Sequence, residues 1–554
     1  MTGRAPRGFV RGMLPSRADY RDLRRTWKGD LLAGLTVGVV ALPLALAFGV
    51  SSGVGAEAGL VTAIVAGLVA AVFGGSNVQV SGPTGAMVVV LAPIVVQYGV
   101  AAVAVVSLIA GAMVIAAGLA RIGRVVTYIP WPVIEGFTLG IAVIIAAQQV
   151  PAALGVPVEV EPHALLGAVD AVLAAQWPVV GWTLGIVAIV AVLMLLLPRI
   201  HRLLPASLIA IVVVTVLATL LDAPVAVIGA LPAQLPAPGL PSLAGIDPLA
   251  LLGPAAAVAA LAAIESLLSA RVAASLAPTG RVDADRELLG QGLASVASGL
   301  FGGMPATGAI ARTAVNVRSG GRTRLAAIVH SLVLLVVVLV ASGLVAGIPL
   351  AALAGVLLIT ATRMVGPATV RAILHSTRSD ALIFIGTAIV TVTFDLITAV
   401  LIGIAAAALV ALRELARSSR VTREDIAGEP QPGDERIAVV RLDGALFFGA
   451  AERVLDELAA IDDVSVVIIR LSQLRSLDAT GARVIADIIV ALERRGVTAI
   501  VKGVQPQHAG LIERVGVTHR LRHPAHLIAS LDDAVEHARL HVRREREAGV
   551  GGAH

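Results

Sequence analysis

The sequence predicts an all-α polytopic membrane protein with a small soluble α/β domain after its membrane part. Of its 554 residues, 57% are hydrophobic and only 14% are charged, whereas soluble domains carry about 25% charged residues. About fourteen apolar segments precede residue 413, and a segment of about 20 apolar residues can cross a bilayer. Beyond residue 413, short β-branched runs alternate with helical patterns, which is typical of an α/β domain.

The expected spans form two sets of seven. An odd number of spans in each half would invert the second half relative to the first, which is the inverted-repeat arrangement. The expected spans are Asp30–Val50, Gly59–Phe73, Val80–Val96, Ala101–Leu119, Val125–Val150, Val179–Leu197, Leu203–Leu221, Pro248–Ala274, Glu287–Phe301, Ala306–Val317, Leu325–Gly347, Pro349–Ala361, Ala381–Phe394 and Ile397–Leu412.

Positive charge gathers in every second loop. Arg121 and Arg124 follow the fourth expected span and Arg199 follows the sixth, whereas loops 151–178 and 222–247 contain no Lys or Arg. Because cytoplasmic loops carry an excess of Lys and Arg, we expect both termini to be cytoplasmic. The sequence pI near 10.3 could also suggest a nucleic-acid partner. The placement of the basic residues in short loops favours membrane topology, so we expect no nucleic acid.

Two related glycine-rich strings interrupt the apolar segments at matching places. Phe73–Gly75 leads to a proline and then to Thr84–Ala86, and Phe301–Gly303 leads to a proline and then to Thr307–Ala309. Irregular backbone is tolerated at membrane depth only where protein buries it or where it lines a cavity. A matched pair of this kind is the best sequence pointer to a transporter binding site. We expect two half-helices whose N-termini face one another and offer free N–H groups to an anion.

Motifs in the spans and in the C-terminal part point to one family. The runs GLTVGVVALPLALAFGVSSG, VQVSGPTGAM, IESLLSARVA and FGGMPATGAIARTAVNVRSGGRTRLA resemble the SulP/SLC26 anion transporters, and RLDGALFFGAAERV and SLDATGARVI resemble a STAS domain. The resemblance implies seven plus seven inverted spans, divided into a mobile core and a gate that work as an elevator. It also implies a homodimer in the inner (cell) membrane of a bacterium.

The predicted substrate site lies at the two half-helix starts. Backbone N–H groups there could bind an oxyanion without a side-chain charge; alternatively, the small residues only allow close helix packing. The resemblance adds a positive charge, Arg312, and a ring that caps the pocket, Phe48. The alternatives are an arginine that snorkels from a helix end and a phenylalanine that only packs. The predicted set is Phe48, Thr84, Gly85, Gly308, Ala309, Ile310, Ala311 and Arg312.

A coupling ion is expected beside Glu265, the only acid in its expected span, with Ser269 one turn later on the same face. A buried carboxylate titrates, holds a cation or pairs with a base. The resemblance places a coupling site here, where sodium-using members have an aspartate and two threonines. Glu265, Ser269 and Ile310 depart from that pattern, which favours H⁺ over Na⁺. The alternative is a structural pair of Glu265 with Arg271 or Arg312.

The domain boundaries follow from composition. We expect an N-terminal cytoplasmic segment (1–29), a transport domain (30–415), a linker (416–434), a STAS domain (435–545) and a tail (546–554). In stand-alone STAS proteins the position of Thr480 is phosphorylated; the alternative is an ordinary helix cap at Asp478 or Thr480. No phosphate-binding loop, metal cluster or catalytic triad is recognisable in the sequence, so we expect no cofactor, no metal site and no enzyme.

The sequence therefore favours secondary active transport of a small anion. Bicarbonate and sulfate are the leading substrates, and a C4-dicarboxylate is the next candidate. The second hypothesis is an uncoupled anion channel, or a membrane sensor that signals through the STAS domain. Glu265 favours coupled transport over a channel, since a channel needs no titrating group. Substrate identity cannot be read from the sequence, because backbone N–H groups bind many oxyanions alike.

Overall fold

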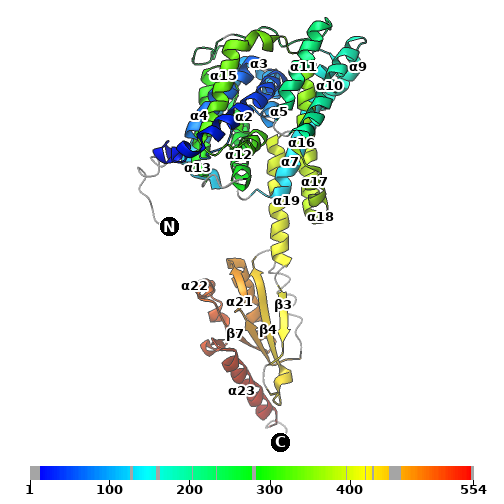
Figure 1. Ribbon diagram of the computed structural model, residues 1–554. Coiled ribbons are helices and arrows are strands. Elements are labelled where there is room, and N and C mark those ends of the chain that lie inside the picture. Colours follow the sequence, from blue (N-terminus) through cyan, green and yellow to red (C-terminus); the bar gives the residue numbers. More distant parts are fainter. Residues whose placement is uncertain are drawn as a thin grey trace. The chain divides into compact units, whose positions relative to one another are not determined.

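The computed structural model contains two units, Met1–Ile404 and Ala405–His554, and each is described by itself. The first is helical and the second is an α/β domain (Figure 1). The structure describes residues 13–124, 129–157, 163–201, 204–232, 234–276, 282–394, 396–417, 420–426, 429–447 and 463–550.

Each of the predicted apolar segments contains helix in the first unit. Among the described residues, eight helices are long and apolar enough to cross a membrane. Helices α9 and α17 were not expected from the sequence. The helices are α2 (Leu23–Ser51), α3 (Ala56–Val61), α4 (Gly67–Phe73), α5 (Gly85–Tyr98), α6 (Val100–Leu119), α7 (Trp131–Gln148), α8 (Val150–Leu154), α9 (Ala164–Ala174), α10 (Val179–Ile200), α11 (Ala206–Leu220), α12 (Leu252–Leu276), α13 (Ala284–Leu300), α14 (Ile310–Arg318), α15 (Arg324–Ala346), α16 (Leu350–Met364), α17 (Pro367–Leu374), α18 (Arg378–Thr393) and α19 (Leu396–Arg417).

Small residues allow two helix pairs to approach closely. On the α6–α13 contact, a Cβ added to Gly292 would lie 2.6 Å from the carbonyl oxygen of Gly111. On the α2–α15 contact, a Cβ on Gly34 would lie 2.5 Å from the carbonyl oxygen of Ala326. In lipid, helix association depends on such close packing, because apolar burial gives no driving force between helices.

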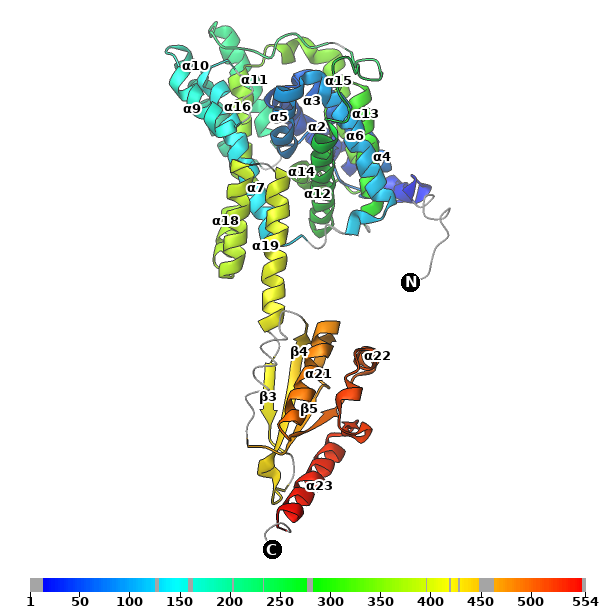
Figure 2. The ribbon, with the colours of Figure 1, turned by 180° about the vertical axis from the view of Figure 1, so that it is seen from behind.

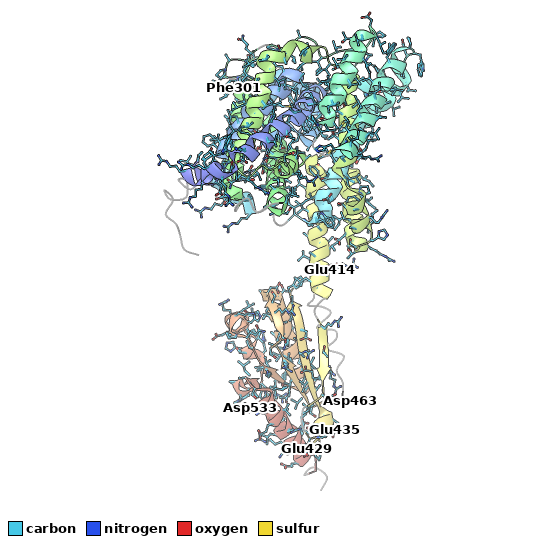
Figure 3. All side chains as sticks on the ribbon, viewed as in Figure 1. Phe301, Glu414, Glu429, Glu435, Asp463 and Asp533 are labelled. Atoms are coloured by element: carbon cyan, nitrogen blue, oxygen red, sulfur yellow. The ribbon has the colours of Figure 1, made fainter. Side chains whose placement is uncertain are left out.

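The second expected span is broken by one π-helical turn, Thr62–Ala66, between α3 and α4. Single π turns are frequent at functional sites. Here Thr62 Oγ1 accepts a hydrogen bond from the backbone N–H of Met304 at 2.8 Å. The π turn is thereby joined to the second glycine-rich string, whose first residue, Phe301, is labelled in Figure 3.

The second unit is built on a sheet with the order β3-β4-β5-β7-β8, in which β6 also pairs with β4. Alternate residues of β4 belong to different cores: Val440 shares one with Ile489 of α21, and Val439 shares the other with Ala538 of α23. Because successive strand residues point to opposite faces, α21 and α23 cover the two faces of the sheet. The elements are β3 (Arg420–Glu424), β4 (Ile437–Leu446), β5 (Val466–Arg470), β6 (Leu474–Leu477), α21 (Ala479–Arg494), β7 (Thr498–Lys502), α22 (Pro506–Val515), β8 (Leu527–Ile528) and α23 (Leu531–Val550).

The structure corrects two predicted boundaries. Arg420–Glu424, placed in the linker, is strand β3 and pairs antiparallel with β4, so the sheet begins inside the expected linker. Helix α23 runs to Val550, into the expected tail. The strands expected at Ile437–Leu442, Val464–Leu471 and Val497–Lys502 match β4, β5 and β7, whereas the helix expected at Ala450–Ile461 lies outside the described residues.

Candidate functional site

The two glycine-rich strings meet in the first unit. Strand β1 (Ser81–Gly82) pairs antiparallel with β2 (Thr307–Gly308), and Ala309 N–H donates to the carbonyl of Val80 at 2.8 Å. Each strand leads to a helix, α5 after β1 and α14 after β2. Figure 2 labels α14 beside α12, with which it packs. Two helix N-termini therefore start from one short strand crossing.

The repeated letters TGA do not occupy equivalent places. In the first string the helix begins inside them, at Gly85, whereas in the second it begins after them, at Ile310. The first helical hydrogen bonds are Val88 N–H to Thr84 and Thr313 N–H to Ala309. The N–H groups that precede these bonds belong to residues 85–87 and 310–312. Neither helix is capped by a side chain of its N-cap residue, so these groups point to an acceptor outside the helix.

Two predicted binding residues are already occupied. The N–H of Gly308 donates to Ser266 Oγ at 3.0 Å, and that of Ala309 donates to Val80. The structure thus corrects the expectation that the N–H of Ala309 is free, because this residue precedes the helix and is bonded at the strand crossing. The first helical residues Ile310 and Ala311 are exposed, so the start of α14 is accessible.

Arg312 is buried in the first unit, with 2% of its surface exposed. Its Nη2 donates to the carbonyl of Pro83, just before α5. Its Nη1 has no hydrogen-bond partner within the described part of the chain. A Cβ added to Gly82 would lie 2.7 Å from that Nη1, so glycine leaves the room for it. The snorkelling interpretation is wrong, because the guanidinium is buried at the start of the opposite half-helix.

Two apolar side chains cover the first residue of α5. A Cβ on Gly85 would lie 2.3 Å from Ile145 Cδ1 and 3.4 Å from Phe48 Cε1. The ring edge of Phe48 therefore lies near the first residue of α5. Its role as a cap of the anion pocket stays a prediction. Ile145, on α7, was not predicted; nothing in its apolar segment distinguishes it from its neighbours, and only the fold brings it to the start of α5.

Glu265 on α12 lies between two threonine hydroxyls. Its Oε2 accepts from Thr84 Oγ1 at 2.8 Å and from Thr307 Oγ1 at 2.7 Å, and the two hydroxyl oxygens lie 3.2 Å apart. Ion pairs among the described residues do not join Glu265 to Arg271 or Arg312. Thr307 was missed from the sequence, although the repeated TGA letters contain it. The carboxylate thus contacts both strings at once.

Ser269 is not bonded to Glu265. Its hydroxyl lies 3.2 Å from Thr313 Oγ1 of α14, and that oxygen accepts from Val80 N–H at 3.0 Å. The helical spacing of four residues correctly put both on one side of α12. The serine hydroxyl nevertheless contacts Thr313 of α14 and not the Glu265 carboxylate.

A second buried carboxylate, Glu287 of α13, holds the first string in place. It is 1% exposed, and its Oε2 accepts from the N–H groups of Gly75 at 2.8 Å and Ser76 at 3.0 Å. A Cβ on Gly75 would lie 1.9 Å from the carbonyl of Asp283. The glycines of Phe73–Gly75 therefore allow this segment to lie against the start of α13. There the Glu287 carboxylate accepts hydrogen bonds from the N–H groups of Gly75 and Ser76.

Thr480 lies in the second unit, exposed in the first turn of α21. The cap of that turn is Asp478, whose Oδ1 accepts from Gly481 N–H at 2.7 Å. Capping is thus assigned to the aspartate, which leaves the hydroxyl of Thr480 on the surface. Its phosphorylation stays a prediction.

Comparison with known proteins decides the family. The sulfate permease family matches residues 27–387, and the STAS domain family matches residues 431–534. The chain belongs to the sulfate permease family. This confirms the resemblance seen in the sequence, together with the C-terminal STAS domain, and members of this family are transporters rather than enzymes.

Relatives of this permease cover nearly its whole length. It is 33% identical over 507 residues to the Bacillus subtilis protein named "Putative sulfate transporter YvdB", covering 89% of this chain and 94% of that one. It is 31% identical over 568 residues to the bicarbonate transporter BicA of Picosynechococcus sp., covering 97% and 98%.

Solved structures share the fold. The transmembrane domain of a cyanobacterial BicA superposes with a TM-score of 0.61 and 36% identity, covering 68% of this permease and 97% of that chain. SLC26A9 superposes with a TM-score of 0.82 over 98% of this chain and 95% of that one. At 18% identity, this second likeness shows the fold alone: a helical multi-span membrane domain followed by a STAS domain.

Proposed function

We propose that this permease is a secondary active transporter that binds sulfate or bicarbonate between the N-termini of α5 and α14. The observation that carries the proposal is Arg312 Nη1, which is buried at the start of α5 without a hydrogen-bond partner among the described residues. Helix N-termini attract anions through their N–H groups and the helix dipole. A buried guanidinium adds a full charge, and an oxyanion would supply its missing acceptor.

The side chains around this position fit a small oxyanion. Phe48 and Ile145 approach the first residue of α5, and apolar walls strengthen the electrostatic attraction by excluding water. The exposed start of α14 provides access. Relatives named as a putative sulfate transporter and as a bicarbonate transporter support these two anions ahead of a C4-dicarboxylate, which remains the alternative substrate.

We further propose that transport is coupled to H⁺ through Glu265. One carboxylate oxygen accepts from both Thr84 and Thr307, which leaves the other oxygen to carry a proton. Because Thr84 and Thr307 belong to the strings that lead to α5 and α14, a proton there and an anion at the helix starts would act on the same backbone. Neutralising Glu265 removes a negative charge near the anion. Protonation and anion binding should therefore favour one another, and this linkage is reciprocal.

The architecture proposed for this transporter is fourteen spans in two inverted sets of seven, with core and gate moving as an elevator. The antiparallel crossing of β1 and β2 supports the inversion, because chains that approach a common point from opposite directions are what inverted halves produce. A homodimer, both termini in the cytoplasm and a bacterial inner-membrane location complete the proposal. The Arg-free loops 151–178 and 222–247 support this orientation.

Uptake into proteoliposomes tests transport and coupling together. Wild type should accumulate labelled sulfate or bicarbonate under an inward H⁺ gradient, and a sodium gradient at equal pH should have no effect. Glu265→Gln mimics the protonated carboxyl and should keep exchange while losing accumulation; Glu57→Gln, on α3, is the control. Accumulation by sodium alone would overturn H⁺ coupling, and an uncoupled channel would show no accumulation in any variant.

A further inference from the structure

Three histidines of the STAS domain lie together at one end of its sheet. His526 comes from the short 3₁₀ turn Pro524–His526, and His537 and His541 come from α23. Each offers a ring nitrogen, and these nitrogens all lie within 4.8 Å of one another. The sequence analysis expected no metal site, because the three are separated in the chain and only the fold brings them together.

Two rigid elements hold the cluster. His537 and His541 are four residues apart on a helix and so share one face, and α23 is fixed to the sheet by Ala534 and Ala538, which are fully buried. His526 directly precedes β8, which pairs parallel with β7. The ligand positions are therefore set by packing and by sheet hydrogen bonds, as a preorganised site requires.

The distance between His537 and His541 fits a tetrahedral ion. The Nε2 atoms of His537 and His541 are 3.3 Å apart. Two nitrogens bound at about 2.0–2.1 Å to a tetrahedral zinc lie about 3.3 Å apart. The His526 ring centroid lies 5.4 Å from that of His537 and 5.2 Å from that of His541. The ring centroids of His537 and His541 are 5.0 Å apart, so the third ring lies at a similar distance from the pair.

His526 supplies an independent sign of a ligand. Its surface is 3% exposed, and its Nδ1 has no hydrogen-bond partner among the residues that the structure describes. Buried polar atoms are normally satisfied, and each exception requires an explanation. A lone pair donated to a metal ion would supply the missing partner.

Two acids of this domain are paired with arginines. Of the nearby acids, Glu493 pairs with Arg522 at 2.7 Å and Glu545 pairs with Arg436 at 3.1 Å. His523, whose ring centroid is 6.2 Å from that of His526, uses Nδ1 to accept from Ala525 N–H. A water would complete four ligands.

We propose that His526, His537 and His541 bind one Zn²⁺ ion, which fastens the C-terminal helix to the edge of the STAS sheet. Neutral imidazole is a preferred ligand of zinc, and three histidines with one further position form a complete tetrahedral site. The ion would join β8 to α23, whose Asp533 is labelled in Figure 3 one turn before His537. The proposal is independent of the transport mechanism.

Zinc binding to the purified full-length protein tests it. After removal of metal with a chelator, wild type should take up one Zn²⁺ per chain, measured by elemental analysis and by competition with a chromophoric chelator. His537→Gln and His541→Gln should each weaken binding at least about tenfold, the smallest effect usual at a metal site. His519→Gln, an exposed histidine of the same domain, should bind as wild type does.

A second measurement needs no variant and so does not depend on their folding. Zn²⁺ should protect His537 and His541 of wild type from diethyl pyrocarbonate while His519 stays reactive, as read by mass spectrometry. Absence of zinc uptake by wild type, equal affinity in His537→Gln, or equal protection of His519 would each overturn the proposal. The cluster would then be packed, hydrogen-bonded neutral rings only.

Discussion

Two buried groups of positive charge in the membrane unit differ in their partners. Arg286 donates through Nη1 and Nη2 to both oxygens of Asp19, each at 2.9 Å, and Arg324 lies 3.9 Å from the same carboxylate. Arg312 donates through Nη2 to the carbonyl of Pro83, and its Nη1 has no hydrogen-bond partner in the described residues. The first group shares a carboxylate partner inside the protein, although Arg324 Nε also lacks a hydrogen bond among the described residues. Arg312 has no carboxylate partner of this kind in the described part of the chain, and we propose that an external anion takes that place.

This difference suggests that the Asp19–Arg286 pair stabilises the fold and that Arg312 serves ligand binding. Removing one member of a buried ion pair leaves an uncompensated charge, which is strongly destabilising. Removing Arg312 takes away a desolvation cost and leaves no buried carboxylate unpaired; the Pro83 carbonyl loses one hydrogen bond. The two groups should therefore respond oppositely: stability should depend on Asp19 and Arg286, and ligand affinity should depend on Arg312.

The largest expected effect is on stability. Asp19→Ala leaves Arg286 and Arg324 buried together and should lower the free energy of unfolding by about 3–5 kcal/mol. The lower end is expected because the Asp19 side chain keeps 12% of its surface exposed. Thermal unfolding in detergent measures the change, and Asp22→Ala, at an exposed acid nearby, is the control. Equal melting of the two variants would show that the cluster contributes no stability.

Acid should weaken the same cluster. Burial raises the pKa of the Asp19 carboxyl, but its hydrogen bonds to Arg286 and to the Ser16 N–H, with the charge of Arg324, hold that pKa below its ordinary value. A lowered pKa gives stability that is complete above the unfolded value of about 3.9 and is lost as pH falls through the folded value. The melting difference between wild type and Asp19→Asn should shrink as pH falls below about 4; a constant difference would contradict this.

A smaller effect tests the wall of the proposed anion site. The Cβ of Gly85→Ala would crowd Ile145 Cδ1. It should lower the free energy of unfolding by about 1 kcal/mol, the lower end for overpacking, because a terminal methyl can turn away. Anion affinity, measured by calorimetry, should fall. Adding Ile145→Val removes the crowded methyl and should restore binding. If the double variant stays as weak as Gly85→Ala, crowding at the start of α5 is not the cause.

The sequence was most informative where a pattern is local. Apolar length located most helices of the membrane unit, short β-branched runs located strands β4, β5 and β7, and proline and glycine located the interruptions. The family motif located Arg312. These predictions depend on residues that are close together in the chain, so a short stretch of sequence contains the evidence for each of them.

The remaining features depend on contacts between distant segments. Thr307 reaches Glu265, Ile145 reaches Gly85 and His526 reaches α23 only because of the fold. Free N–H groups were predicted at Thr84, Gly85, Ala309, Ile310 and Ala311. That of Ala309 is bonded to Val80 instead, which only the strand register shows. Only His537 and His541 had a readable signal, since their spacing of four residues on a helix is a usual metal-ligand spacing.

The most direct test of the account compares two arginines of one helix. Arg312→Ala removes the buried charge at the start of α5, whereas Arg318→Ala removes an exposed charge at the end of α14. A charge at a helix end contributes about 0.3–2 kcal/mol, so calorimetry with sulfate and bicarbonate should show affinity about 2- to 30-fold lower for Arg312→Ala. Arg318→Ala should bind as wild type does, and neither variant should melt lower. Unchanged affinity in Arg312→Ala would place the anion elsewhere and contradict the central claim.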